Sequence, residues 1–74
     1  MRDKDFAVRL GERIRIARDL KGLTLRQLAE SADVAASTVS RLENGTGLIT
    51  LDGFVRLCDA MGIDPARMLP ARKK

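Results

Sequence analysis

The chain has 74 residues, about half the length of a common domain, so the sequence has room for one small domain. Hydrophobic residues make up 45% of it and charged residues 32%, a balance typical of a folded globular protein and unlike that of a disordered one. The formal net charge of +4 suits an anionic partner.

The residue types that are missing exclude several kinds of chemistry. The chain has no histidine, tryptophan or tyrosine, and Cys58 is its single cysteine. A lone cysteine forms no intramolecular disulfide and no zinc site of the Cys/His type, and the apolar position of Cys58 beside Leu57 predicts a buried, inert thiol. No nucleophile with a base, carboxylate pair or metal cluster has a credible spacing, so we expect no enzymatic activity, no cofactor and no small-molecule ligand.

Membrane segments and export signals are also missing from the pattern. The longest apolar run is far shorter than the ~20 residues of a membrane span, and residues 1–5 lack the apolar segment of a signal peptide. We therefore expect a cytoplasmic protein without membrane contact. The polybasic residues 72–74 are interpreted as a solvated end of the chain.

Apolar periodicity predicts an all-α chain of five short helices, without strand alternation or repeats. We expect them over residues 5–20, 25–32, 36–43 and 51–61, with a last short helix from Pro65 to Met68 or Leu69. The apolar residues expected to form their inner faces are Phe6, Leu10, Ile14, Ala17, Leu20, Leu25 or Leu28, Ala29, Ala32, Val39, Leu42, Leu51, Phe54, Val55, Leu57 and Cys58.

Capping residues mark the ends of these helices. Thr24 and Gln27 have the capping-box spacing, in which each side chain binds an otherwise unpaired backbone amide of the other residue. Thr50 and Asp64 offer side-chain caps for the last two helices. Gly45 closes the third helix, because glycine tolerates the left-handed conformation that helix ends often require.

Residues 24–45 place two short helices around a tight turn, which is the spacing of a helix-turn-helix motif. The residues that carry it are Leu23-Thr24-Leu25-Arg26-Gln27-Leu28-Ala29-Glu30 and Val34-Ala35-Ala36-Ser37-Thr38-Val39-Ser40-Arg41-Leu42-Glu43-Asn44-Gly45. Both runs resemble the Cro and phage-repressor family of helix-turn-helix regulators, also called the XRE family, and the likeness extends over residues 10–69. The resemblance implies a compact, five-helix, lambda-repressor-like fold. It further implies one DNA-binding domain over residues 1–74, with its core at about 5–69 and a basic tail at 70–74.

The same resemblance implies which side chains contact double-stranded DNA. It places Ala36, Ser37 and Arg41 at the base edges in the major groove, with Thr38 and Ser40 at the groove margin. An arginine is well suited to this position because its guanidinium donates two parallel hydrogen bonds to guanine. The residues expected at phosphates are Thr24, Arg26, Asn44, Gly45, Thr46 and Arg15.

Two further sets of residues receive structural roles. By resemblance, Arg18 pairs with Glu43 and joins the first helix to the third. A single domain of this size contacts one DNA half-site. We therefore expect a homodimer on a near-palindromic operator with half-sites ~34–36 Å apart. The apolar C-terminal residues expected at the dimer interface are Phe54, Met61, Ile63, Met68 and Leu69. The alternative, strongest for Phe54, is that these side chains complete the core of the monomer.

Some positions depart from the pattern of the resembling family. Ala35 stands where a serine or threonine often caps the recognition helix, and Asp33 replaces a common glycine of the turn. Aspartate tolerates the left-handed region better than most residues, so we expect the turn to form. Leu25 stands where a glutamine commonly contacts phosphate.

The sequence therefore predicts a sequence-specific transcriptional regulator, a dimeric repressor or controller protein. This profile resembles the stand-alone controller proteins of restriction-modification systems and small phage or plasmid repressors. The alternative is an antitoxin-like or adaptor module that uses the same fold to hold a partner protein, because fold alone does not decide function.

Overall fold

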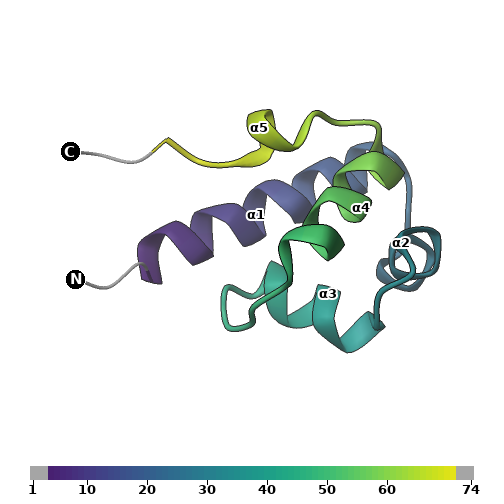
Figure 1. The fold of residues 1–74 in the computed structure, drawn as a ribbon, viewed down its shortest axis with the longest axis horizontal. Coiled ribbons are helices and arrows are strands. Elements are labelled where there is room, and N and C mark those ends of the chain that lie inside the picture. The colour runs from purple at the N-terminus through teal and green to yellow at the C-terminus, as the bar shows by residue number, and fades with distance from the viewer. Residues whose placement is uncertain (1–3, 72–74) are drawn as a thin grey trace.

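The computed structural model describes residues 4–71, and within them the chain forms five helices and no strand. In chain order these are α1 (Lys4–Leu20), α2 (Leu25–Ala32), α3 (Ala36–Glu43), α4 (Leu51–Met61) and α5 (Pro65–Met68). Figure 1 shows α1 along the length of the molecule, α5 above it, α3 below it and α2 end-on at the right. The all-α, five-helix prediction is confirmed, and α1 begins one residue earlier than expected.

The predicted caps explain why the helices start where they do. The Thr24 hydroxyl oxygen accepts a hydrogen bond from the Gln27 amide at 3.0 Å, and the Gln27 side chain accepts one from the Thr24 amide at 2.9 Å. Thr50 accepts from the amide of Gly53, and the Asp64 carboxylate caps α5. These side chains satisfy first-turn amides that a helix leaves unpaired.

The turn between α2 and α3 also has the predicted conformation. Asp33 ends α2 in the left-handed region with φ 57° and ψ 47°, which aspartate accepts more readily than most residues. Ala35 precedes α3 and makes no side-chain cap. α3 therefore begins with less local support than α2.

The core lies between α1 and α3, between α2 and α3, and where α2 packs on α4. Its fully buried large side chains are Ile14, Leu28, Val39, Leu57, Cys58 and Met61. The prediction that Leu20 and Leu51 lie in the core is wrong, because Leu20 is 83% exposed and Leu51 is 78% exposed. Each is the end residue of its helix, beyond the region that the neighbouring helices cover.

Close backbone contact fixes α3 against α1. A Cβ atom at Gly11 would overlap the carbonyl oxygens of Leu42 and Glu43 at the end of α3. Gly45 has a φ of 74° and lies against the backbone of Val8. The absence of side chains at these two glycines therefore sets how closely α1 and α3 approach.

Several expectations fall on the ends of the chain. Residues 1–3 and the basic residues 72–74 lie outside the described residues, so the limits of a single domain and the role of the basic tail stay predictions. Within residues 4–71, no helix is both long enough and apolar enough to cross a membrane.

Candidate nucleic-acid interface

The helix α3 has a buried face and an open one. Val39 and Leu42 are buried in the core, which fixes the rotation of the helix about its axis. Ala36, Ser37 and Arg41 are exposed on the other side. Thr38 and Ser40 are half-buried between the two faces.

Arg41 is anchored by its backbone while its guanidinium stays available. Its carbonyl oxygen accepts hydrogen bonds from the Thr46 amide at 3.0 Å and from the Thr46 hydroxyl at 3.4 Å. A Cβ at Gly47 would lie 2.6 Å from the Arg41 Cβ, so the loop after α3 presses on the base of this side chain. Within residues 4–71 no carboxylate pairs with Arg41. Its Nε donates a long hydrogen bond to the Ser37 carbonyl at 3.5 Å, so the terminal nitrogens of this exposed cation are the donors offered to an external acceptor.

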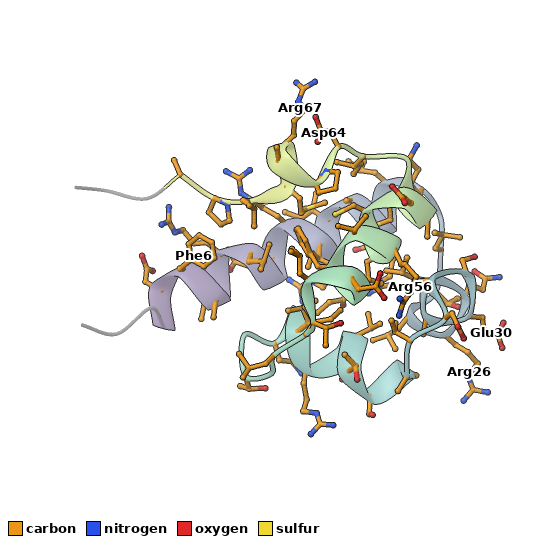
Figure 2. All side chains as sticks on the ribbon, viewed as in Figure 1. Phe6, Arg26, Glu30, Arg56, Asp64 and Arg67 are labelled. Carbon is orange, nitrogen blue, oxygen red and sulfur yellow. The ribbon has the colours of Figure 1, made fainter. Side chains whose placement is uncertain are left out.

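The start of α2 presents polar groups of a suitable kind for phosphate. Thr24 is exposed, and its hydroxyl uses only acceptor capacity in the cap, so the hydroxyl hydrogen can still be donated. Arg26 is exposed in the first turn, and Figure 2 shows it pointing away from the molecule near Glu30. Arg15 is exposed on α1. Each of these groups is accessible.

The backbone amides of the loop after α3 are already paired within the chain. The amides of Asn44, Gly45 and Thr46 all donate to carbonyls of α3, at 3.0–3.1 Å. These amides therefore close the end of α3, and the expected phosphate contacts of Asn44, Gly45 and Thr46 stay a prediction. Exposed side chains remain at Asn44 and Thr46.

The structure brings Arg18 and Glu43 together. Arg18 donates from Nε to Glu43 Oε2 at 2.6 Å and from Nη2 to Oε1 at 3.0 Å, and its Nη1 donates to the Leu23 carbonyl at 2.9 Å. The two side chains are 13% and 5% exposed, and the hydrogen bond to Glu43 raises the pKa of Arg18. This bidentate ion pair joins α1 to the end of α3, and the third bond of Arg18 joins α1 to the loop before α2.

The predicted dimer surface is mostly wrong. Phe54, Met61 and Met68 are buried at 6%, 1% and 4% exposure, since α4 and α5 fold them against the other helices of the same chain. Ile63 is half-buried against this core, and Leu69 is 45% exposed. Only these last two still reach the surface.

Cys58 lies deep in the core, as the sequence predicts. It is fully buried, and burial raises the pKa of its thiol to about 11. The thiol is therefore protonated at neutral pH, which makes it a packing group with little nucleophilic character.

Some residues around this surface were not identified from the sequence. Leu48 is 95% exposed in the uncharged loop that follows α3, although apolar side chains of this size are more often buried. The close contacts at Gly11 and Gly47 depend on the approach of distant segments, and no sequence pattern marks them.

Comparisons with known proteins point to one kind of protein. A family model described as a helix-turn-helix domain matches residues 9–70. An HTH-type transcriptional regulatory protein of Pyrococcus furiosus is 40% identical over 53 residues, which are 70% of this chain but 17% of that protein.

Solved structures show the same similarity in three dimensions. The restriction-modification controller protein C.AhdI from Aeromonas hydrophila is 30% identical with a TM-score of 0.82, over 85% of this chain and 96% of that chain. The BldD DNA-binding domain of S. venezulae is 28% identical with a TM-score of 0.77, over 89% of this chain and 99% of that domain. The likeness therefore covers nearly the whole of these two solved chains, whereas it covers a small part of the Pyrococcus protein.

Proposed function

The chain belongs to the helix-turn-helix domain family of XRE-like regulators, and on that basis we propose that it is a sequence-specific reader of double-stranded DNA. In this proposal α3 enters the major groove and α2 lies across the phosphate backbone. The exposed face of α3 carries the proposal, because Arg41 stands there without a carboxylate partner among residues 4–71.

Each exposed group has a role that follows from its chemistry. Arg41 reads guanine through two hydrogen bonds, Ser37 offers a hydroxyl to a base or phosphate, and Ala36 offers a methyl contact. Thr38 and Ser40 line the groove margin. The groups that bind phosphate are the side chains of Thr24, Arg26, Asn44, Thr46 and Arg15 and the open amides of the first turn of α2.

We further propose that two copies act together on a near-palindromic operator. One α3 helix reads one half-site, so a two-fold pair doubles the sequence that is recognised. Ile63 and Leu69 are the members of the expected dimer surface that still reach solvent. The similarity to a controller protein from a restriction-modification system favours control of transcription by a repressor or controller of this kind.

The test is selection from a randomised duplex pool, followed by fluorescence anisotropy at several salt concentrations. We expect a recovered inverted repeat, two chains per duplex in sedimentation equilibrium, and affinity that falls steeply with salt. A reporter promoter carrying the recovered repeat then distinguishes repression from activation. Weak binding without sequence preference would contradict the proposal and would favour an adaptor that holds a partner protein.

Replacing Arg41 tests the proposed base contact directly. We expect Arg41→Ala to relax discrimination at one base position by ~1–3 kcal/mol while the other positions keep their preferences. The measurement is anisotropy on duplexes that vary one position at a time. Unchanged discrimination at every position would remove Arg41 from base reading.

A further inference from the structure

The turn between α2 and α3 is held from outside by a side chain of α4. Arg56 donates from Nε to the Ala32 carbonyl at 2.8 Å and from Nη2 to the Asp33 carbonyl at 3.4 Å. Its Nη1 donates to the carboxylate of Asp52, one turn earlier on α4. Figure 2 shows Arg56 extending from α4 toward α2. The guanidinium therefore connects the turn to a helix that packs firmly in the core.

The carbonyls that Arg56 binds lie at the end of α2, where a helix leaves its last carbonyls unpaired. The backbone supplies part of the closure, since the amides of Asp33 and Val34 donate to Glu30 and Ala29. Arg56 supplies two further donors, to the carbonyls of Ala32 and Asp33. A cation at this point also interacts favourably with the negative end of the α2 dipole.

The direction of α3 depends on this turn. Asp33 holds a left-handed conformation three residues before α3 begins, and Ala35 gives the new helix no side-chain cap. Few local polar interactions therefore restrain the start of α3. The hydrogen bonds from Arg56 restrain this turn from another helix.

We propose that Arg56 is a positioning residue for DNA recognition, which sets the angle at which α3 presents Ser37 and Arg41 to the bases. This inference rests on the proposed function. The Arg56 side chain is 40% exposed, so its bonds restrain the turn without being buried in the core. Its removal is expected to change recognition more than folding.

The test compares Arg56→Met with Arg67→Met on the selected duplex and on an unrelated one. Both variants remove one positive charge and keep an unbranched stem like the aliphatic part of arginine. Arg67 is the matched control because it is exposed on α5, on the opposite side of the molecule from α3 (Figure 2). We expect Arg56→Met to lower affinity for the selected duplex by about tenfold relative to Arg67→Met. The two variants should match in affinity for the unrelated duplex and in salt dependence.

Two results on DNA would overturn the proposal. An equal loss on both duplexes, with the slope of log affinity against log salt reduced by about one, would make Arg56 a direct phosphate contact. Affinity for the selected duplex within about twofold of the Arg67→Met value would leave Arg56 without a role in recognition. Circular dichroism at the assay temperature gives the folded fraction of each variant. Should Arg56→Met fold poorly, Asp52→Asn keeps the guanidinium but removes its anchor, and a smaller loss confined to the selected duplex is expected.

Amide hydrogen exchange tests the same idea without DNA. We expect faster exchange at Val34, within the turn, and at Thr38, in the first turn of α3, in Arg56→Met but not in Arg67→Met. Unchanged exchange at both amides would overturn the positioning role even if the wild-type chain binds DNA. If the wild-type chain selects no duplex while exchange rises as expected, the proposed function fails and the structural role of Arg56 stands.

Discussion

The two ends of α3 are held in different ways. At its C-terminal end, Glu43 forms a bidentate ion pair with Arg18, and the two side chains are 5% and 13% exposed. At its N-terminal end, the turn is bound by Arg56, which is 40% exposed and paired with an Asp52 that is 79% exposed. A buried pair is costly to break because one charge is left unpaired, whereas exposed pairs contribute little to stability. The C-terminal end therefore secures the fold, and the N-terminal end is the place where the orientation of α3 can change at small cost.

The largest effect is expected at the buried pair. Arg18→Met should lower the free energy of unfolding by ~3–5 kcal/mol, because it leaves the Glu43 carboxylate buried without its partner. Urea denaturation followed by circular dichroism measures this change, with Arg15→Met, an exposed arginine of the same helix, as the control. The double variant Arg18→Met with Glu43→Leu should recover part of the loss, because no charge is then left unpaired. Equal stability of Arg18→Met and Arg15→Met would show that the C-terminal end of α3 is held no more strongly than its N-terminal end.

A smaller loss is expected where α1 touches the end of α3. Gly11→Ala places a Cβ against the carbonyls of Leu42 and Glu43, and backbone at this contact has to shift. We expect a loss of roughly 1–3 kcal/mol of unfolding free energy, since inserting a group into a tight contact forces strain. Gly22→Ala is an informative comparison, because a Cβ there has nothing within 4 Å and only its φ of 71° opposes the change. Thermal denaturation of the two variants separates crowding from backbone strain, and a larger loss at Gly22 would contradict the tight α1 to α3 contact.

The smallest expected effect is a gain in stability at the N-terminal end of α3. Ala35→Ser gives α3 the side-chain cap that it lacks, which should stabilise the chain by about 1 kcal/mol. Thermal denaturation measures the gain, and Ala35→Val, which offers no hydroxyl, is the control. A stabilised variant with unchanged sequence preference would show that the start of the helix tolerates adjustment. No gain in stability over the valine variant would show that the backbone amides in the first turn of α3 already have adequate partners.

Features of the fold that depend on near neighbours were predictable from the sequence. The capping box at Thr24 and Gln27 and the left-handed residue at Asp33 involve residues a few positions apart, so the sequence pattern contains them. The contact of Arg18 with Glu43 spans 25 positions and was expected by family resemblance alone.

Features that depend on how the helices pack were not predictable. Arg56 reaches Ala32 across 24 positions, and its position on α4 indicates only the local pair with Asp52. Met68 was expected at a dimer surface, because apolar periodicity does not reveal how much core volume the chain itself fills. The family resemblance identified the exposed residues of α3, and their contacts with DNA stay a prediction.

The hydrogen bond from Arg9 to the Ala71 carbonyl, at 3.1 Å, joins the two ends of the described chain. Figure 1 shows the beginning of α1 and the segment after α5 at the same end of the molecule, away from α2. For protein engineering, adjacent ends mean that this unit can be inserted into a surface loop of a host protein through short linkers. They also permit circular permutation, with the two ends of the described chain linked and new ends opened at the exposed Leu48.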